Sequence, residues 1–144
     1  MLGGTFESHP WVYTDTVTIA VHDQDHPASK PWGKQFTITD EIYKFKHWQP
    51  EKVRVLMSLN IAETAKKAPY HVPVAWVKQY GQGRVFYISL GHRDDVWTNP
   101  TYMQSIFGAI QWVQGRVEGD ATPNPEVSAA QQRKAEADFN AAPQ

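Results

Sequence analysis

Two strand-like runs separated by a short glycine-rich turn constrain the fold of this chain most strongly. Residues 72–80 and 84–90 are both rich in β-branched and aromatic side chains, which favour extended structure. Gly81-Gln82-Gly83 between them has the length and composition of a hairpin turn, with a glycine where the backbone needs a positive φ. The sequence therefore predicts an antiparallel β-hairpin.

Other segments predict further strands before this hairpin. Residues 16–22 alternate polar and apolar side chains and are β-branched, and residues 53–59 are almost continuously apolar. Residues 36–39 form a shorter candidate strand. Residues 40–45 also alternate, although a single helical turn is an alternative there.

A helix is predicted after the hairpin. Asn99 precedes Pro100, and this pair fits an N-cap followed by proline at the first helical position. Apolar residues recur at helical spacing over residues 100–117, which predicts an amphipathic helix. These residues are Met103, Ile106, Phe107, Ile110 and Val113.

Composition and charge exclude several classes of protein. A chain of 144 residues that is 41% hydrophobic fits one globular domain, and a net charge of -1 without a basic stripe does not favour a nucleic acid partner. The absence of cysteine excludes a disulfide framework, a thiolate zinc site and a cysteine nucleophile. No run of about 20 apolar residues is present and no signal peptide pattern begins the chain, so we expect a soluble protein without a membrane partner.

Four separated motifs resemble the ThuA-like (trehalose utilisation) family, over about residues 3–116. Their order and spacing both fit the family pattern. The motifs are Gly3-Gly4-Thr5-Phe6 with Ser8-His9-Pro10, Asp25-His26-Pro27, Thr39-Asp40-Glu41-Ile42-Tyr43, and Pro73-Val74-Ala75-Trp76 continuing through Gly83-Arg84-Val85-Phe86-Tyr87 to Leu90-Gly91-His92.

The resemblance implies an α/β fold of the class I glutamine amidotransferase type. We expect a truncated flavodoxin-like sandwich in which residues 1–117 form the C-terminal portion of a ThuA-like domain, with the antiparallel hairpin followed by a helix. Residues 118–144 are a polar tail with a short helix over 126–139 if something docks it. Because the family's first β-α units have no counterpart here, we expect a homo-oligomer or a missing N-terminal half on another polypeptide.

His92 is the first candidate for chemistry, because it directly follows the second hairpin strand. In amidotransferases, which the chain resembles, a His-x-Glu pair occupies this place, and here Asp94 stands two residues after His92 to orient the ring. The alternative is a histidine that only caps the hairpin. His9 is the second candidate, as an acid-base group, a metal ligand or a turn residue. His9 and His92 together would begin a zinc or other divalent site.

A second group of candidates follows the strand over residues 16–22. His22, Asp25 and His26 lie within five residues, and such a loop can bind a divalent metal such as zinc or calcium, although polar clusters of this kind often mark ordinary loops.

Four further residues are candidates for binding a substrate. Glu41 and Tyr43 lie on one side of an extended segment, although Glu41 also suits a solvated edge. Trp97 and Asn99 follow His92 closely, and Trp97 fits either a pocket wall or a cover over the start of the helix.

These observations lead to one functional hypothesis and two alternatives. No serine-hydrolase elbow, phosphate loop or dinucleotide fingerprint is present, so we expect no nucleotide cofactor. The leading hypothesis is a ThuA-like domain that hydrolyses a small, sugar-derived molecule. The alternatives are a metal-dependent hydrolase of a small ester or lactone, such as an acyl-lactone, and a non-catalytic fragment that binds or self-associates.

Overall fold

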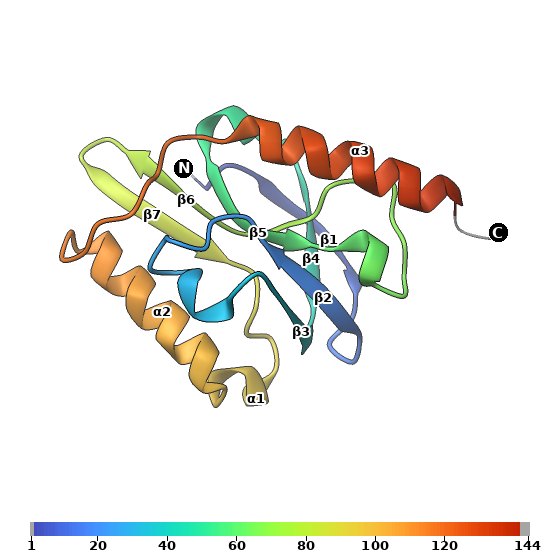
Figure 1. Cartoon of the computed structure of the whole chain (residues 1–144), viewed down its shortest axis with the longest axis horizontal. Helices are drawn as coiled ribbons and strands as arrows, with labels where there is room; N and C mark the ends of the chain where they lie inside the picture. Colours follow the sequence, from blue (N-terminus) through green and yellow to red (C-terminus); the bar gives the residue numbers. More distant parts are fainter. Residues whose placement is uncertain (1, 142–144) are drawn as a thin grey trace.

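The computed structural model describes residues 2–141, which form two β-sheets flanked by helices (Figure 1). A small sheet pairs β1 (Thr5–Trp11) with β4 (Ile42–Lys46). The larger sheet has the strand order β3-β2-β5-β6-β7. Its strands are β2 (Thr16–Val21), β3 (Gln35–Thr39), β5 (Arg54–Leu59), β6 (Pro73–Tyr80) and β7 (Gly83–Ile88). Short 3-10 turns lie at η1 (Lys30–Trp32), η2 (Pro50–Lys52) and η3 (Ile61–Glu63).

The predicted hairpin is confirmed. β6 and β7 pair antiparallel from Tyr80↔Gly83 at the turn to Ala75↔Ile88. Gly81 has φ 59°, a left-handed conformation that glycine adopts without the steric penalty that a Cβ brings. The strands predicted around residues 16–22, 36–39, 40–45 and 53–59 correspond to β2, β3, β4 and β5.

Every strand pairing among residues 2–141 is antiparallel. The prediction of a mixed α/β fold with a hairpin followed by a helix is confirmed by the element order. The parallel β-α units that a flavodoxin-like sheet implies do not occur within this part of the chain.

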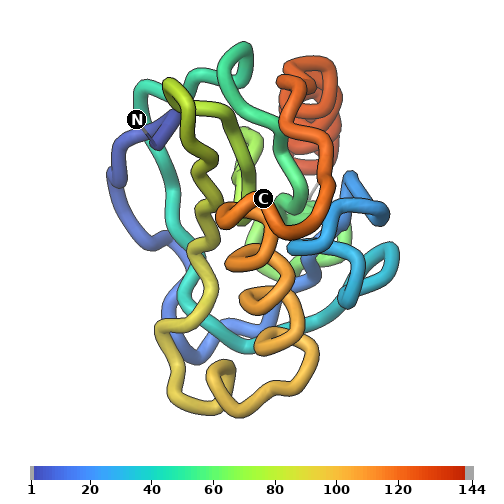
Figure 2. Tube along the Cα trace, turned by 90° about the vertical axis from the view of Figure 1, so that its left-hand side faces the viewer, coloured from blue at the N-terminus to red at the C-terminus, as the bar shows by residue number. Residues whose placement is uncertain are grey.

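The small sheet, the larger sheet and α2 (Pro100–Val113) form layers. Side chains alternate between the two faces of each strand, so the larger sheet presents side chains to the layer on either side of it. On one face, Trp76 of β6 stacks on Tyr87 of β7 at 4.2 Å between ring centroids, and Phe45 of β4 meets Trp76 edge-on at 5.2 Å. Phe86 and Ile88 of β7 pack into the main core on the side of α2. Figure 2 shows the small sheet and α2 on opposite sides of the larger sheet.

Helix α2 follows the short α1 (Asp94–Trp97) and begins as predicted. The Asn99 side chain accepts hydrogen bonds from the amides of Thr101 at 2.9 Å and Tyr102 at 3.3 Å. The helix ends at Val113, earlier than expected, because Gly115 takes φ 70° directly after the C-cap.

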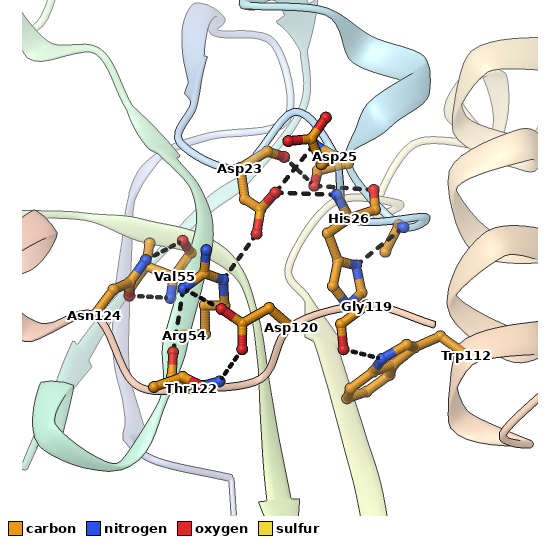
Figure 3. A network of polar contacts seen from close by, with 12 residues as sticks. Asp23, Asp25, His26, Arg54, Val55, Trp112, Gly119, Asp120, Thr122 and Asn124 are labelled. Atoms are coloured by element: carbon orange, nitrogen blue, oxygen red, sulfur yellow. Dashed lines mark hydrogen bonds and ion pairs between the residues drawn. The ribbon is translucent and has the colours of Figure 1, made fainter. Parts of the chain in front are cut away.

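The segment after α2 crosses the large sheet and is held by a polar network (Figure 3). Arg54 binds the carboxylate of Asp23 through Nε at 2.8 Å and that of Asp120 through Nη1 at 3.2 Å. Asn124 accepts from the amide of Val55 at 2.7 Å and donates to its carbonyl at 3.1 Å. The Asn124 side chain thus takes the place of a neighbouring strand at this position of β5.

The tail, in which a short helix over residues 126–139 is expected if something docks it, contains the longer helix α3 (Pro125–Ala141). Ser128 and Ala135 are buried, and Trp48 Nε1 donates to Ser128 Oγ at 3.3 Å, so the helix is docked on the domain. Within residues 2–141, no helix combines the length and apolar character needed to cross a membrane.

Candidate functional site

The carboxylate of Glu41 lies between the imidazole rings of His9 and His92. Oε2 is 3.6 Å from His9 Nδ1, and Oε1 is 3.7 Å from His92 Nδ1. The Glu41 side chain is only 12% exposed, whereas those of His9 and His92 are 53% and 46% exposed. A shielded carboxylate therefore faces two imidazoles that solvent and a small molecule can reach.

Three separate elements bring these residues together. His9 is in β1, Glu41 directly precedes β4, and His92 lies in the loop between β7 and α1. Pairing of β1 with β4, with Trp11 opposite Ile42, holds the first two residues side by side. His9 is a strand residue here, rather than the turn residue that was one of its predicted alternatives.

Asp40 fixes the loop that carries His92. Its buried carboxylate accepts hydrogen bonds from the amides of Gly91 at 2.6 Å and Arg93 at 3.1 Å, on either side of His92. It also accepts from the amide of Glu41 at 3.0 Å. Asp40 thereby positions both members of the Glu41–His92 pair. Sequence reasoning missed this role, although Asp40 stands beside Glu41 in one of the motifs.

A shallow cavity of about 390 Å³ opens beside His92. Its other lining residues are Tyr13, Arg93, Asp94 and Asp95. The Tyr13 ring lies 6.2 Å from that of His92 between centroids. Arg93 forms a two-pronged ion pair with Asp95, at 2.9 Å on each side. Asp94 is exposed and lines this cavity, and the carboxylate that faces His92 Nδ1 is that of Glu41.

The other predicted substrate-binding residues differ in their contacts around this site. Burial and then the negative charges of Glu41 and Asp40 raise the pKa of Tyr43. Trp97 is half exposed and donates from Nε1 to the carbonyl of Gly91 at 2.8 Å, so it covers the His92 loop. Asn99 is occupied as the N-cap of α2.

The residues of the predicted metal loop make structural contacts with the rest of the domain. His22 forms a hydrogen bond with Ser58 Oγ at 2.6 Å, and the His26 ring packs edge-on against Trp112 at 5.0 Å. Burial lowers the pKa of each imidazole to about 4. Asp25 is exposed, and its amide, like that of His26, donates to Asp23 (Figure 3).

Asp23 anchors this loop to β5. Burial opposes its ionisation, but hydrogen bonds from Arg54 and from the amides of His26 and Asp25 hold the pKa of the carboxyl below its ordinary value. Among residues 2–141, no three His, Cys, Asp or Glu side chains gather as a metal site would require.

The fold and these residues match a described protein family. The trehalose utilisation (ThuA) family matches residues 1–113, more than three quarters of the chain. This chain belongs to the ThuA family. The matched range includes His9, Glu41 and His92 and leaves α3 outside.

The comparison with solved structures finds two ThuA-like proteins, of which the first shares the fold. One from Bacteroides uniformis is 25% identical, with a TM-score of 0.60 over 88% of this chain and 53% of its own. Another, from Parabacteroides merdae, is 14% identical, with a TM-score of 0.48 over 85% of this chain and 48% of its own. No curated protein matches the chain. The ThuA domain described here therefore spans about half the length of these structures.

Proposed function

We propose that this ThuA domain hydrolyses a small, sugar-derived molecule at the site formed by His9, Glu41 and His92. One observation carries the proposal: a shielded carboxylate lies between two half-exposed imidazoles, and one of these rings lines a cavity. General acid-base hydrolysis needs one group that accepts a proton from water and another that gives one to the leaving oxygen. The two imidazoles beside the Glu41 carboxylate can supply the group that accepts a proton and the group that gives one.

The geometry favours distinct roles for the two rings. Both turn Nδ1 toward Glu41, so that Nε2 of each is on the far edge of the ring. In the proposed reaction, His92 Nε2 takes a proton from water as the water oxygen attacks the electrophilic carbon. The bond from that carbon to the leaving oxygen breaks, and a protonated His9 gives its proton to that oxygen. Glu41 stabilises whichever ring carries a positive charge.

The surroundings favour a small ring-shaped substrate. A volume of about 390 Å³ is at the small end of ligand pockets. Tyr13 and Trp97 offer half-exposed aromatic surfaces near His92, on which the apolar face of a sugar or lactone ring can rest. A sugar lactone or a sugar ester fits both the aromatic surfaces and the acid-base pair.

The described residues do not fit a tightly bound metal. A zinc site needs at least three protein ligands around one ion, and no three His, Cys, Asp or Glu side chains among residues 2–141 gather in that way. A calcium ion needs six or more oxygen ligands, and this site offers one carboxylate between two imidazoles. We therefore assign no step to zinc or calcium and expect hydrolysis to persist in a chelator.

The test is an assay of the purified chain against sugar lactones, sugar esters and chromogenic acyl esters. We expect His92→Ala to lower kcat/KM by about 100-fold or more, and His9→Ala to lower it by about tenfold or more. His47→Asn is the matched control, because it removes an exposed imidazole elsewhere and asparagine tolerates the φ of 52° at that position.

Two results would overturn the proposal. One is hydrolysis that survives His92→Ala at the rate of the unmodified chain. The other is binding of a sugar ligand, measured by calorimetry, with no turnover of any substrate class, which would make the domain a binding module.

A further inference from the structure

A cavity of about 540 Å³ lies between α3 and the body of the domain. One side comes from β4 and the η2 turn, another from residues 70–73 at the start of β6, and the third from the first half of α3. Its volume is within the range of pockets that hold small ligands. Because the family match ends at residue 113, the α3 wall of this cavity lies outside the matched region.

Aromatic rings form much of the cavity wall. Phe45 and Trp48 line it from β4 and the loop that follows, and Tyr70 and His71 line it from the segment before β6. Trp48 Nε1 donates to Ser128 Oγ of α3 at 3.3 Å, which fixes the indole across the boundary between the helix and the domain. Walls of this kind favour a flat ring, because aromatic faces and edges pack against one another.

Lys44 is the one charged residue of the cavity lining. Its Nζ lies 4.6 Å from the centre of the Tyr70 ring. Among the described residues that line the cavity, none is Asp or Glu. Burial lowers the pKa of His71 to about 3, so this imidazole is neutral at pH 7. A negatively charged group in the cavity would therefore meet one positive charge and no carboxylate of the lining.

Lys44 keeps donors for such a group although it already has a partner. Its Nζ bonds Glu7 at 2.7 Å, and both side chains are about one third exposed, at 34% and 37%. An ammonium group has three N–H donors, so two remain after the bond to Glu7. Glu7 is outside the lining, and it competes with a bound anion for the charge of Lys44.

His71 is a second polar group that a ligand would suit. Within residues 2–141, neither of its ring nitrogens has a hydrogen-bond partner. Folded proteins leave few buried polar atoms in this state. Both nitrogens are covered by protein, so a turn of the imidazole would be needed before a ligand could bond one of them.

We propose that this cavity binds a small aromatic carboxylate. The ring of the ligand lies against Trp48 and Tyr70, and its carboxylate faces Lys44. Such a ligand touches both α3 and the body of the domain, so binding also holds α3 in place. The proposal does not rest on the proposed hydrolysis, because His9, Glu41 and His92 are not among the lining residues.

The test compares two probes by calorimetry: indole-3-acetate and indole-3-acetamide, which has the same ring but no charge. We expect the acid to bind with a Kd of about 1 mM or lower and the amide about fivefold or more weakly. Lys44→Met should bring the two affinities together, because the side chain keeps its length and loses its charge. Lys46→Met is the matched control, since it changes an exposed lysine of the same strand outside the cavity. Glu7→Gln should tighten binding of the acid alone.

Two neighbouring alanines of α3 test the position of the ligand. Ala129 lines the cavity and Ala130 does not, and both are exposed, so a larger side chain at either position should leave the melting temperature nearly unchanged. Ala129→Phe should weaken binding of the acid about tenfold or more by filling the cavity, and Ala130→Phe should not. Amide exchange along α3 should slow when the acid binds.

Four results would overturn the proposal. The first is no binding of indole-3-acetate to the unmodified chain, and the second is equal binding of the acid and the amide. The third is tighter binding of decanoate, a flexible carboxylate without a ring, which would make the site one for fatty acids. The fourth is loss of binding in His92→Ala with none in Ala129→Phe, which would place the probe at the His9–Glu41–His92 site.

Discussion

His92 Nδ1 lies 3.7 Å from Glu41 Oε1, although the two residues belong to widely separated parts of the chain. Asp40 holds them in this arrangement, because its buried carboxylate bonds the amides of Gly91, Arg93 and Glu41. The site therefore depends on a rigid support, as well as on the groups that would perform the chemistry. Each part can be tested separately.

Glu41→Gln should abolish most hydrolysis while preserving the fold. Glutamine has nearly the same shape but cannot stabilise an imidazolium, so we expect kcat to fall about 100-fold with little change in KM. The free energy of unfolding should change by less than about 0.5 kcal/mol. The control is Glu51→Gln, at an exposed position outside the site. Full activity in Glu41→Gln would show that the carboxylate has no part in the reaction.

Asp40→Asn should loosen the His92 loop and destabilise the domain. An amide offers one acceptor oxygen where the carboxylate offers two, so at least one of the three bonded N–H groups loses its partner. We expect the free energy of unfolding to fall by about 2 kcal/mol. Amide exchange at Gly91 and Arg93, followed by NMR, should become faster. Unchanged exchange at both amides would contradict the positioning role of Asp40.

Asn124→Ala should destabilise the docked tail. The substitution leaves the buried amide and carbonyl of Val55 without the partners that they now have, and we expect a loss of about 2 kcal/mol in a urea titration. Asn140→Ala changes an exposed asparagine on α3 and should have an effect within about 0.5 kcal/mol. Equal effects of the two substitutions would mean that Asn124 contributes no specific docking.

The domain should lose stability between pH 7 and pH 4. Burial lowers the pKa of His26 to about 4 from an ordinary value of 6.5, so the unfolded chain binds the proton more readily than the folded chain. The contribution of His26 to the free energy of unfolding is fully present above pH 6.5 and is lost as the pH falls through 4. At pH 4 the loss is about 3 kcal/mol. His22 acts in the same direction, since burial lowers its pKa to about 4 as well.

Urea titrations across this range measure the effect, with His26→Gln as the comparison. Glutamine does not titrate, so the variant should show a weaker dependence on pH than the parent chain. The same slope in both proteins would mean that His26 does not titrate differently on folding.

Features that depend on neighbouring residues could be predicted from the sequence. The β6–β7 hairpin follows from two extended runs around a turn that needs a glycine at positive φ, and Gly81 has this conformation. The start of α2 follows from Asn99 and Pro100, because an asparagine side chain reaches the first amides of the helix that it precedes. The family motifs also pointed to His9, Glu41 and His92 as separate candidates.

Tertiary packing alone decided how these parts meet. The sequence offered Asp94, two residues from His92, as its partner, whereas the pairing of β1 with β4 and the bonds of Asp40 bring Glu41 to that position. Met103, Phe107 and Ile110 recur at helical spacing, which says that one face of α2 is apolar but not which face packs. In the fold these side chains are exposed, and Gly108 lies on the packed side against Pro27. Local conformation is set by steric and hydrogen-bonding preferences within a few residues, whereas partners across the fold are set by which surfaces pack together.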